Sequence, residues 1–112
     1  MMANCIFCQI IGNQISVPRV YEDDRLIVIA DKYPKAPVHL LLIPREHIAS
    51  LEELTSQQDS LVAHMIGLLP EVARKGGLKE GFRTIINTGP GGGQEIPHLH
   101  IHVLGGGQLP GF

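Results

Sequence analysis

The chain has 112 residues, which suffice for one domain with a single two-layered core, and we expect residues 1–112 to form that one domain. The formal charge is −2 and the nine Lys and Arg form no run, so nucleic acid is not an expected partner. No apolar run approaches about 18 residues, and the N-terminus lacks a basic segment followed by an apolar core. We therefore expect a cytoplasmic protein that does not enter a membrane.

The first half of the chain predicts a short helix followed by strands. A helix or tight turn is expected over residues 5–11, ended by a Gly-Asn pair. A short strand near Tyr21 is followed by an acidic turn and by residues 26–29, an apolar run rich in β-branched side chains that predicts a buried strand. Residues 39–43 form another apolar strand, antiparallel to its neighbour and stopped by a proline.

The second half predicts one long helix and two further strands. Apolar residues recur at helical spacing from an N-cap at Thr55 or Ser56 to Lys75, where a Gly-Gly pair ends the helix. Pro70 lies inside this helix and lacks a backbone donor, so we expect a kink or a restart there. Residues 82–87 predict the strand that precedes a glycine-rich loop. The fold class is therefore α+β.

Three histidines alternate with aliphatic residues near the C-terminus. Because successive side chains of a strand point to opposite faces, His98, His100 and His102 are expected in one row on one face. The intervening side chains then enter the core; they are Leu99, Ile101 and Val103. Imidazoles that titrate near neutral pH can bind metal, relay protons or act as nucleophiles. Three in register on a strand favour a functional site over a merely structural strand.

Two features close to this row can support it. The loop of residues 88–94 is rich in glycine, which allows its backbone amides to approach an anion such as phosphate, although it matches no P-loop. Asp31 follows a predicted strand, where its carboxylate can accept hydrogen bonds from ribose hydroxyls or can cap the loop. His39 opens the next strand, and its role depends on whether it faces the three histidines.

Cys5 and Cys8 form a Cys-x-x-Cys pair that precedes every predicted strand, which argues against a thioredoxin-like role. A disulfide across so small a loop would add little stability, so a metal or redox role is expected. A metal hydrolase is one alternative, because His-x-His on a strand can supply two ligands to one ion.

The run from His98 to Leu104 fits the pattern His-φ-His-φ-His-φ-φ, where φ is apolar, and it resembles the histidine-triad (HIT) nucleotide-binding hydrolases. Further segments match that family's motifs in the family's order, so that the resemblance spans roughly residues 4–107; they are Cys5-Ile-Phe-Cys8, Tyr21-Glu-Asp-Asp24, Ala36-Pro-Val-His39, Ile43-Pro-Arg-Glu-His47-Ile48, Ile86-Asn87 and Gly92-Gly-Gln94. The chain is most similar to the nucleoside phosphoramidase branch. This resemblance implies a five-stranded antiparallel sheet with one long and one short helix, which dimerises into a ten-stranded sheet.

The resemblance also implies roles for individual residues. His100 would be the nucleophile, His102 would contact the phosphate and the leaving group, and His39 and His98 would complete the imidazole cluster. The nucleotide-binding positions would be Asp31 for the ribose, Ile27 and Leu41 beside the base, and Asn87, Gly93, Gln94 and Glu95 around the phosphate, together with His100 and His102. Glu95 departs from the family, because the eukaryotic relatives often carry Ser there.

The expected reaction is cleavage of the P–N bond of purine nucleoside phosphoramidates through a nucleotidyl-histidine intermediate, which releases a nucleoside monophosphate. Two alternatives stay open: a dinucleoside polyphosphate hydrolase of the same superfamily, and a non-catalytic purine nucleotide-binding or partner module.

A structural zinc ion is the expected cofactor, because a set of four residues resembles the zinc site of some family members; the set is Cys5, Cys8, His47 and His98. The competing interpretation leaves the cysteines free and assigns His98 only to the imidazole cluster. A homodimer is expected, because one small sheet would leave an apolar edge and helix surface around Leu61, Met65 and Leu68 incompletely covered.

Overall fold

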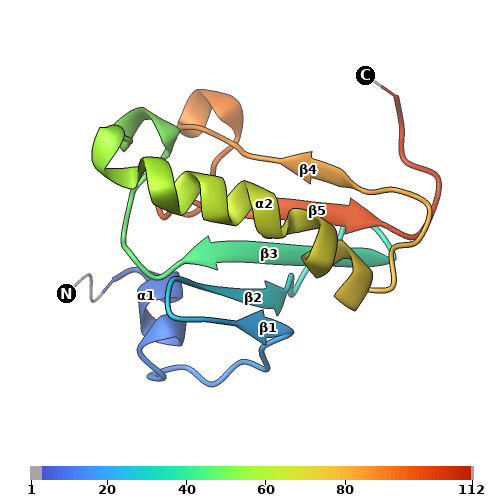
Figure 1. Ribbon diagram of the computed structural model, residues 1–112, viewed down its shortest axis with the longest axis horizontal. Coiled ribbons are helices and arrows are strands. Elements are labelled where there is room, and N and C mark those ends of the chain that lie inside the picture. The colour runs from blue at the N-terminus through green and yellow to red at the C-terminus, as the bar shows by residue number, and fades with distance from the viewer. Residues whose placement is uncertain (1–3, 112) are drawn as a thin grey trace.

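The computed structural model describes residues 4–111, and its centre is a five-stranded antiparallel sheet. The strand order is β1-β2-β3-β5-β4 (Figure 1). The strands are β1 (Tyr21–Glu22), β2 (Leu26–Ala30), β3 (Val38–Pro44), β4 (Arg83–Ile85) and β5 (Ile101–Gly105). The helices are α1 (Ile6–Ile11) and α2 (Asp59–Lys75), with short 3-10 turns η1 (Leu51–Glu53), η2 (Ser56–Gln58) and η3 (Pro90–Gly92). The α+β class and the five-stranded sheet are as predicted.

Each face of the sheet is covered by one helix, which explains why β2 and β3 are almost continuously apolar. Helix α2 crosses one face (Figure 1) and packs on side chains that alternate along the strands, among them Leu26, Val28, Leu42, Ile101 and Val103. Helix α1 packs on the opposite set through Phe7 and Ile10; that set is Ile27, Ile29, Leu41 and Ile43. The short helix therefore covers only β2 and β3, and the same face of β5 is left for polar side chains.

The long helix ends where the sequence predicts, but the predicted N-cap, Thr55, lies before the 3-10 turn η2, and the α-helix itself begins at Asp59. Thr55 caps the first turn, and a capping box joins Thr55 to Gln58. The α-helix then runs through Pro70 to Lys75 without a restart, so the restart that was one of our two expectations is wrong. Pro70 is exposed, and the packing of the helix's other face against the sheet holds the helix together despite the missing hydrogen bond.

The strand that carries the histidines is shorter than predicted. We expected a strand from His98, but β5 begins at Ile101, where its ladder with β3 ends opposite Leu42. Beyond that point β3 pairs only with β2, and the amide of Leu99 donates instead to the carbonyl of Ile48, which follows β3. The alternation nevertheless persists, because Leu99 lies in the α2-side core while the rings of His98 and His100 both contact Phe7 on the α1 side. The predicted strand at 82–87 likewise shortens to β4, because only Arg83–Ile85 pair with β5.

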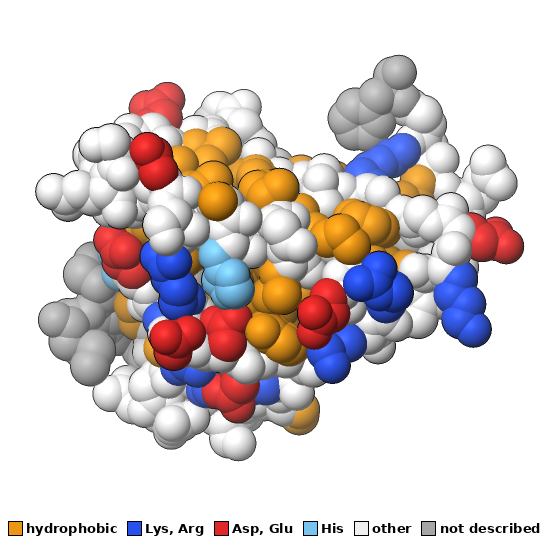
Figure 2. All heavy atoms as spheres, in the orientation of Figure 1, with side chains coloured by type: hydrophobic (Ala, Val, Ile, Leu, Met, Phe, Trp, Pro, Cys, Tyr) orange, Lys and Arg blue, Asp and Glu red, His pale blue; other side chains and the backbone are white. Residues whose placement is uncertain are grey.

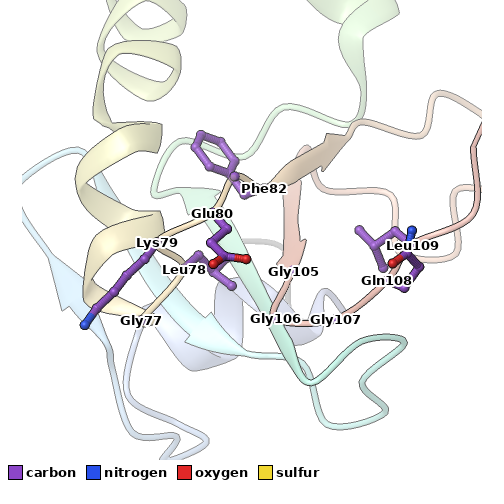
Figure 3. Close-up of a pocket in the computed structure, with 11 residues that line it drawn as sticks. Gly77, Leu78, Lys79, Glu80, Phe82, Gly105, Gly106, Gly107, Gln108 and Leu109 are labelled. Atoms are coloured by element: carbon purple, nitrogen blue, oxygen red, sulfur yellow. The ribbon is translucent and has the colours of Figure 1, made fainter.

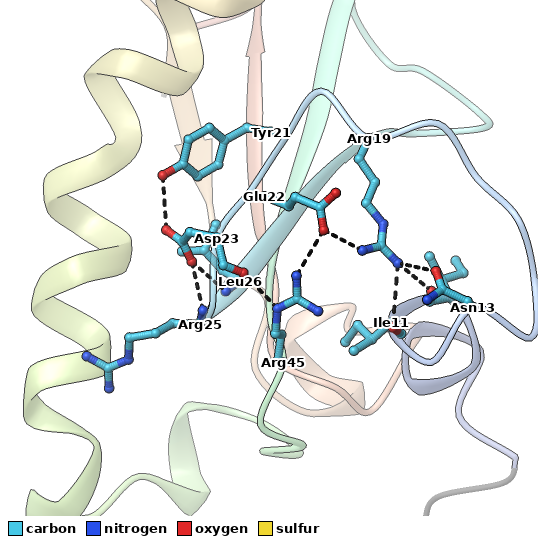
Figure 4. A network of polar contacts seen from close by, with 10 residues as sticks. Ile11, Asn13, Arg19, Tyr21, Glu22, Asp23, Arg25, Leu26 and Arg45 are labelled. Carbon is cyan, nitrogen blue, oxygen red and sulfur yellow. Dashed lines mark hydrogen bonds and ion pairs between the residues drawn. The ribbon is translucent and has the colours of Figure 1, made fainter.

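The turn between β1 and β2 is held by a polar network (Figure 4). Glu22 bonds the guanidinium groups of Arg19 and Arg45, and the carboxylate of Asp23 accepts the amides of Arg25 and Leu26. This network fixes the start of β2 against the end of β3.

Asp23 also bonds the long helix, through Nε2 of His64 at 2.7 Å. Burial opposes ionisation of this carboxyl, but the hydrogen bonds from Arg25, His64, Tyr21 and Leu26 outweigh it and hold its pKa at about 2. His64 therefore has a structural partner within the chain.

The surface over α2 carries apolar side chains beside acidic and basic ones (Figure 2). Two residues on which we based the dimer, Leu61 and Met65, are each only 2% exposed in the core of the same chain, so that part of the argument is wrong. A large apolar side chain of this helix that is exposed is Ile66, at 49%. Among the described residues, no helix is long and apolar enough to cross a membrane.

Candidate functional site

Five of the six histidines lie on the α1 side of the sheet, in two groups joined by His100. The first group consists of Cys5, Cys8, His47 and His98, whose ligand atoms lie within 4.8 Å of one another. The second consists of Asp31, His39 and His102, which meet the same distance criterion. The three histidines of the predicted row thus share a face, yet they serve different groups.

The first group has the dimensions of a tetrahedral metal site. Nδ1 of His98 lies 3.3 Å from Sγ of Cys5, 3.6 Å from Sγ of Cys8 and 3.1 Å from Nδ1 of His47, and Cys8 Sγ lies 3.3 Å from His47 Nδ1. A tetrahedral ion with bonds of about 2.3 Å to sulfur and 2.0 Å to nitrogen separates S from N by roughly 3.5 Å and N from N by roughly 3.3 Å. These four residues can therefore hold a metal ion.

The hydrogen bonds of His98 favour this use. Its Nε2 lies 2.8 Å from the carbonyl oxygen of Pro44, which can only accept, so Nε2 carries the proton. Nδ1 of neutral His98 consequently has a free lone pair, and it points at the two thiols and His47. A second hydrogen bond that fixes the tautomer of a histidine ligand is the usual companion of a metal site.

The hydrogen bonds of His39 have the opposite consequence. The amide of Lys35 donates to Nδ1 of His39 at 3.0 Å, so the proton of neutral His39 is on Nε2. That proton points to Nδ1 of His102, which lies 2.9 Å from His39 Nε2. Oδ2 of Asp31 lies 3.4 Å from His39 Nε2. His102 accepts at Nδ1 and therefore presents its own N–H at Nε2.

A metal ion in this second group would need the lone pair of His39 Nε2. The amide of Lys35 already occupies the lone pair at Nδ1, so ligation would break that bond or require an imidazolate. The geometry therefore favours a proton-relaying pair of histidines here, and it counts against the alternative of a hydrolase whose triad holds its metal.

His100 lies between the two groups and is only 7% exposed. Its Nδ1 lies 2.7 Å from the carbonyl oxygen of His98, so Nδ1 carries the proton and Nε2 keeps the lone pair. The ring centroid of His102 is 5.0 Å away, and the edge of Phe7 packs at 5.1 Å on the other side. This arrangement produces a histidine whose free nitrogen is nucleophilic, next to a second histidine that can transfer protons.

Burial makes His39 and His102 poor bases. It lowers the pKa of His39, and Lys35 adds to this effect while Asp31 opposes it. Burial and the neighbouring imidazoles of His100 and His39 lower the pKa of His102 to about 4. Both rings are therefore neutral in the free protein at neutral pH.

The glycine-rich loop folds into the turn η3, which uses several of its own amides. The amide of Gly93, which we expected to hold phosphate, donates to the carbonyl of Pro90 at 3.0 Å. Asn87 donates its side-chain amide to the carbonyl of Gly92 at 2.8 Å. Gly93 has φ of 80°, a left-handed conformation that favours glycine. The loop thus has a defined shape, and a phosphate that bound here would compete with or share these bonds.

Gln94 fastens the loop to the rest of the site. Its Nε2 donates to the carbonyls of Ala49 and Ile96, at 2.7 and 2.9 Å, and its Oε1 accepts the amide of Gly89 at 2.8 Å. Both donor hydrogens are used, so this side chain positions the loop and has none left for a ligand.

The other predicted nucleotide-binding residues differ in accessibility. Asp31 is partly exposed and also caps its loop by accepting the amide of Tyr33. Leu41 is buried beneath α1, and Ile27 has no exposed surface, which excludes a direct base contact by Ile27 in this conformation. Glu95 is exposed and lines a cavity of about 410 Å³ with neighbours that include the two metal-cluster residues Cys5 and His47.

A cavity of about 840 Å³ lies elsewhere, between the end of α2 and the C-terminal segment (Figure 3). Its lining runs from Gly77 to Phe82 and from Gly105 to Leu109, and it contains none of the candidate site residues. Gly105 faces Leu78 of the α2-side core, so this cavity opens on the side of the sheet away from the histidines.

Sequence reasoning missed the contacts that set the proton positions. Phe7 packs on both His98 and His100, and its place inside the Cys-x-x-Cys pair was an available signal. The amide of Lys35 and the carbonyl of Pro44 were not foreseeable, because backbone groups carry no signature of their partners in the sequence.

These features define a small α+β protein in which a histidine-rich site adjoins a candidate metal centre. A family model described as "Scavenger mRNA decapping enzyme C-term binding" matches residues 4–109. Protein HitA of Neisseria gonorrhoeae is 48% identical over 104 residues, covering 93% of this chain and 97% of its own. A HIT-like protein of Synechococcus elongatus is 47% identical over 109 residues, covering 97% and 96%.

Solved structures agree. A HIT family hydrolase from Clostridium thermocellum superimposes with a TM-score of 0.94 at 39% identity, covering 100% of this chain and 98% of the other. A HIT family hydrolase from Legionella pneumophila gives 0.91 at 39% identity, covering 96% of each. The chain belongs to the histidine-triad family, and the resemblance seen in its motifs is confirmed.

Proposed function

We propose that the protein hydrolyses purine nucleoside phosphoramidates through a covalent nucleotidyl-histidine. The observation that carries this proposal is the bond from His100 Nδ1 to the His98 carbonyl, which leaves Nε2 of His100 free to attack. A neutral imidazole whose lone pair is placed on Nε2 by a backbone carbonyl, here that of His98, is a competent nucleophile for phosphorus. Both structural neighbours named above are HIT family hydrolases.

In the first step, Nε2 of His100 forms a bond to phosphorus and the P–N bond of the substrate breaks. The departing nitrogen needs a proton, which His102 would supply from Nε2. The pKa of His102 is about 4 in the free protein, but a bound anionic phosphate raises the pKa of a nearby imidazole and so favours the imidazolium form. Nδ1 of His102 then also carries a proton, so Nε2 of His39 would have to accept it, with the proton of His39 moved to Nδ1 in place of the bond from the Lys35 amide. The amine then leaves with that proton, and His102 becomes neutral.

In the second step, a water molecule attacks phosphorus and the bond to His100 breaks. Neutral His102 takes the proton of the water, which restores the imidazolium and returns His100 with its free lone pair. The products are a nucleoside monophosphate and an amine, so atoms and protons balance across the two steps. Asn87 and the turn held by Gln94 would stabilise the charge on the phosphoryl oxygens, and Asp31 would bind the ribose.

The direct test compares adenosine phosphoramidate with diadenosine polyphosphate on the purified protein. We expect AMP to be released from the phosphoramidate with the higher kcat/KM. Faster cleavage of the dinucleotide would assign the protein to the alternative hydrolase class. Tight nucleotide binding with no turnover of either compound would identify a non-catalytic binding module.

We also propose that the ion held by Cys5, Cys8, His47 and His98 is zinc. Two thiolates and two imidazoles are a preferred zinc ligand set, and four protein ligands leave no open position, so the ion would be structural. Both cysteines are free in the structure, and they must stay reduced to bind metal, which suits the cytoplasm that we propose as the location.

A homodimer completes the proposal. Strand β4 lies at the edge of the sheet, where a second copy could add a strand, and Ile66 is exposed on α2. Light scattering should give twice the chain mass at micromolar concentrations, and Ile66→Lys should shift the equilibrium toward monomer. A monomer mass for the unaltered protein throughout that range would refute the dimer.

A further inference from the structure

His98 takes part in two arrangements at once. Its ring Nδ1 points into the candidate metal centre, 3.3 Å from Cys5 Sγ and 3.1 Å from His47 Nδ1. Its carbonyl oxygen accepts the Nδ1 proton of His100 at 2.7 Å. Because one residue carries both contacts, a bond that fixes the His98 ring also restrains the backbone whose carbonyl bonds His100.

Phe7 makes a second connection between the same two places. It lies between Cys5 and Cys8 in the sequence, and its ring contacts His98 at 5.7 Å and His100 at 5.1 Å between centroids. Helix α1 has only six residues, too few to be stable alone, so its position depends on tertiary contacts. Ligation by the two cysteines would anchor the helix and hold Phe7 against His100.

Cation binding would convert the first group, two thiols and two imidazoles, into a rigid centre. Because Nε2 of His98 donates to Pro44, the Nδ1 atom of the neutral ring brings a lone pair to within 3.1 Å of His47 Nδ1. A bound ion accepts that lone pair together with those of the thiolates. Without the ion, the ring of His98 keeps its hydrogen bond to Pro44 and its packing against Phe7, but no ligand bond fixes its Nδ1 atom.

We propose that metal ligation by His98 holds its carbonyl, together with Phe7, in the position that keeps His100 correctly oriented and protonated on Nδ1, so that metal occupancy controls kcat. The inference rests on the nucleophilic role proposed for His100. His98 is then a positioning residue, and the metal takes no part in the chemical step. Coupling between protein sites commonly amounts to about 5- to 150-fold. Metal removal should therefore lower kcat by about tenfold or more and leave KM within about threefold.

The test follows the proton of His100 directly. The full-length protein, labelled with ¹⁵N in its histidines, is stripped with a chelator, checked by elemental analysis and circular dichroism, and reloaded with zinc. With metal, NMR at neutral pH should show His100 as a single tautomer protonated on Nδ1. Without metal, the ¹⁵N chemical shifts of its two ring nitrogens should move toward each other, as in a ring that exchanges between its two tautomers. The chemical shifts of His64, which bonds Asp23 on another face, should stay unchanged.

Variants at Cys8 separate positioning from general destabilisation. Cys5 also caps α1 through its sulfur, so Cys8 is the cleaner choice. Cys8→Ser should lose metal, the single tautomer and kcat together, and Cys8→His, which can still ligate, should restore all three. A folded Cys8→Ser or stripped protein that binds no metal, yet keeps the His100 tautomer and kcat, overturns the proposal. So does absence of metal from the native protein.

Failure of the proposed function has a different signature. If the loaded protein shows no phosphoramidate turnover, that function is wrong, whereas the coupling is still decided by whether the nitrogen shifts of His100 respond to zinc.

Discussion

The carbonyl oxygen of His98 accepts a hydrogen bond from Nδ1 of His100 at 2.7 Å, and this contact determines which nitrogen of His100 keeps a free lone pair. A backbone carbonyl cannot donate, so the proton stays on Nδ1 and the lone pair stays on Nε2. The amide of Lys35 imposes the opposite tautomer on His39. The backbone thus fixes opposite tautomers on His100 and His39.

Replacing His100 by Asn should abolish turnover and preserve the fold. The Asn side-chain amide can still donate to the His98 carbonyl, but it offers no nucleophilic lone pair, so the loss falls on the chemical step. We expect kcat to fall by at least about 10⁴-fold, with nucleotide affinity nearly unchanged, as measured by steady-state kinetics and calorimetry.

The matched control for this variant is His64→Asn, which alters a histidine bonded to Asp23 on the α2 side and should leave kcat unchanged. If His100→Asn retained kcat within about tenfold of the unaltered protein, a barrier difference of only about 1.4 kcal/mol, covalent catalysis by His100 would be excluded.

The depressed pKa of His102 should make stability depend on pH. Burial and the imidazoles of His100 and His39 lower this pKa to about 4, against about 6.5 in an unfolded chain. As the pH falls from about 6.5 to about 4, His102 of the unfolded chain binds a proton before His102 of the folded protein does. The contribution of His102 to the free energy of unfolding is therefore highest above about pH 6.5 and falls between about pH 6.5 and about pH 4. Urea midpoints should therefore decline more steeply with falling pH in the unaltered protein than in His102→Gln. Parallel curves for the two proteins would contradict the depressed pKa.

Gln94 should be needed to hold the glycine-rich loop in its observed shape. Gln94→Ala leaves the carbonyls of Ala49 and Ile96 and the amide of Gly89 without their partner, which costs about 1–3 kcal/mol of unfolding free energy. Because the loop is then less well held, KM for the phosphoramidate should rise more than kcat falls. Gln57→Ala, at an exposed position, is the control. Unchanged stability and KM in Gln94→Ala would show that the loop's own backbone hydrogen bonds suffice to hold its shape.

Much of the fold was predictable, because β2 and β3 are covered on both faces and therefore read as apolar runs. The ends of the strands were harder to predict from the sequence. The start of β5 at Ile101 depends on where β3 stops pairing, and the alternation of His98, Leu99 and His100 continues past that point without a ladder. A side-chain pattern reports which face is buried and not which backbone groups are paired.

The site was predictable as a set of residues and less so as an arrangement. The motifs named the four residues that gather as a candidate metal cluster, and the structure brings those residues together. The assignment of His98 to that cluster, and of His39 to His102, depends on the backbone carbonyl of Pro44 and the amide of Lys35. Such partners are common to all residues, so the sequence carries no trace of them.

Pro70 should be replaceable with a gain in stability. It is exposed in the interior of α2 and cannot donate to the carbonyl of Ile66, so Pro70→Ala adds a helical hydrogen bond and should raise unfolding free energy by about 1–3 kcal/mol. Gly67→Ala, where a methyl group meets nothing within 4 Å, should gain less, up to about 1 kcal/mol. Thermal unfolding of both variants, with activity unchanged, checks this. A less stable Pro70→Ala would mean that packing of α2 requires the proline.

The central claim, that His100 becomes covalently attached to phosphorus, is tested most directly by the stereochemistry of the reaction. A nucleoside phosphoramidate made chiral at phosphorus with sulfur is hydrolysed in isotopically labelled water, and the configuration of the thiophosphate product is determined. Each in-line displacement inverts phosphorus, so attack by His100 followed by attack by water predicts net retention. Net inversion would mean that water attacks the substrate directly, and it would contradict the covalent account.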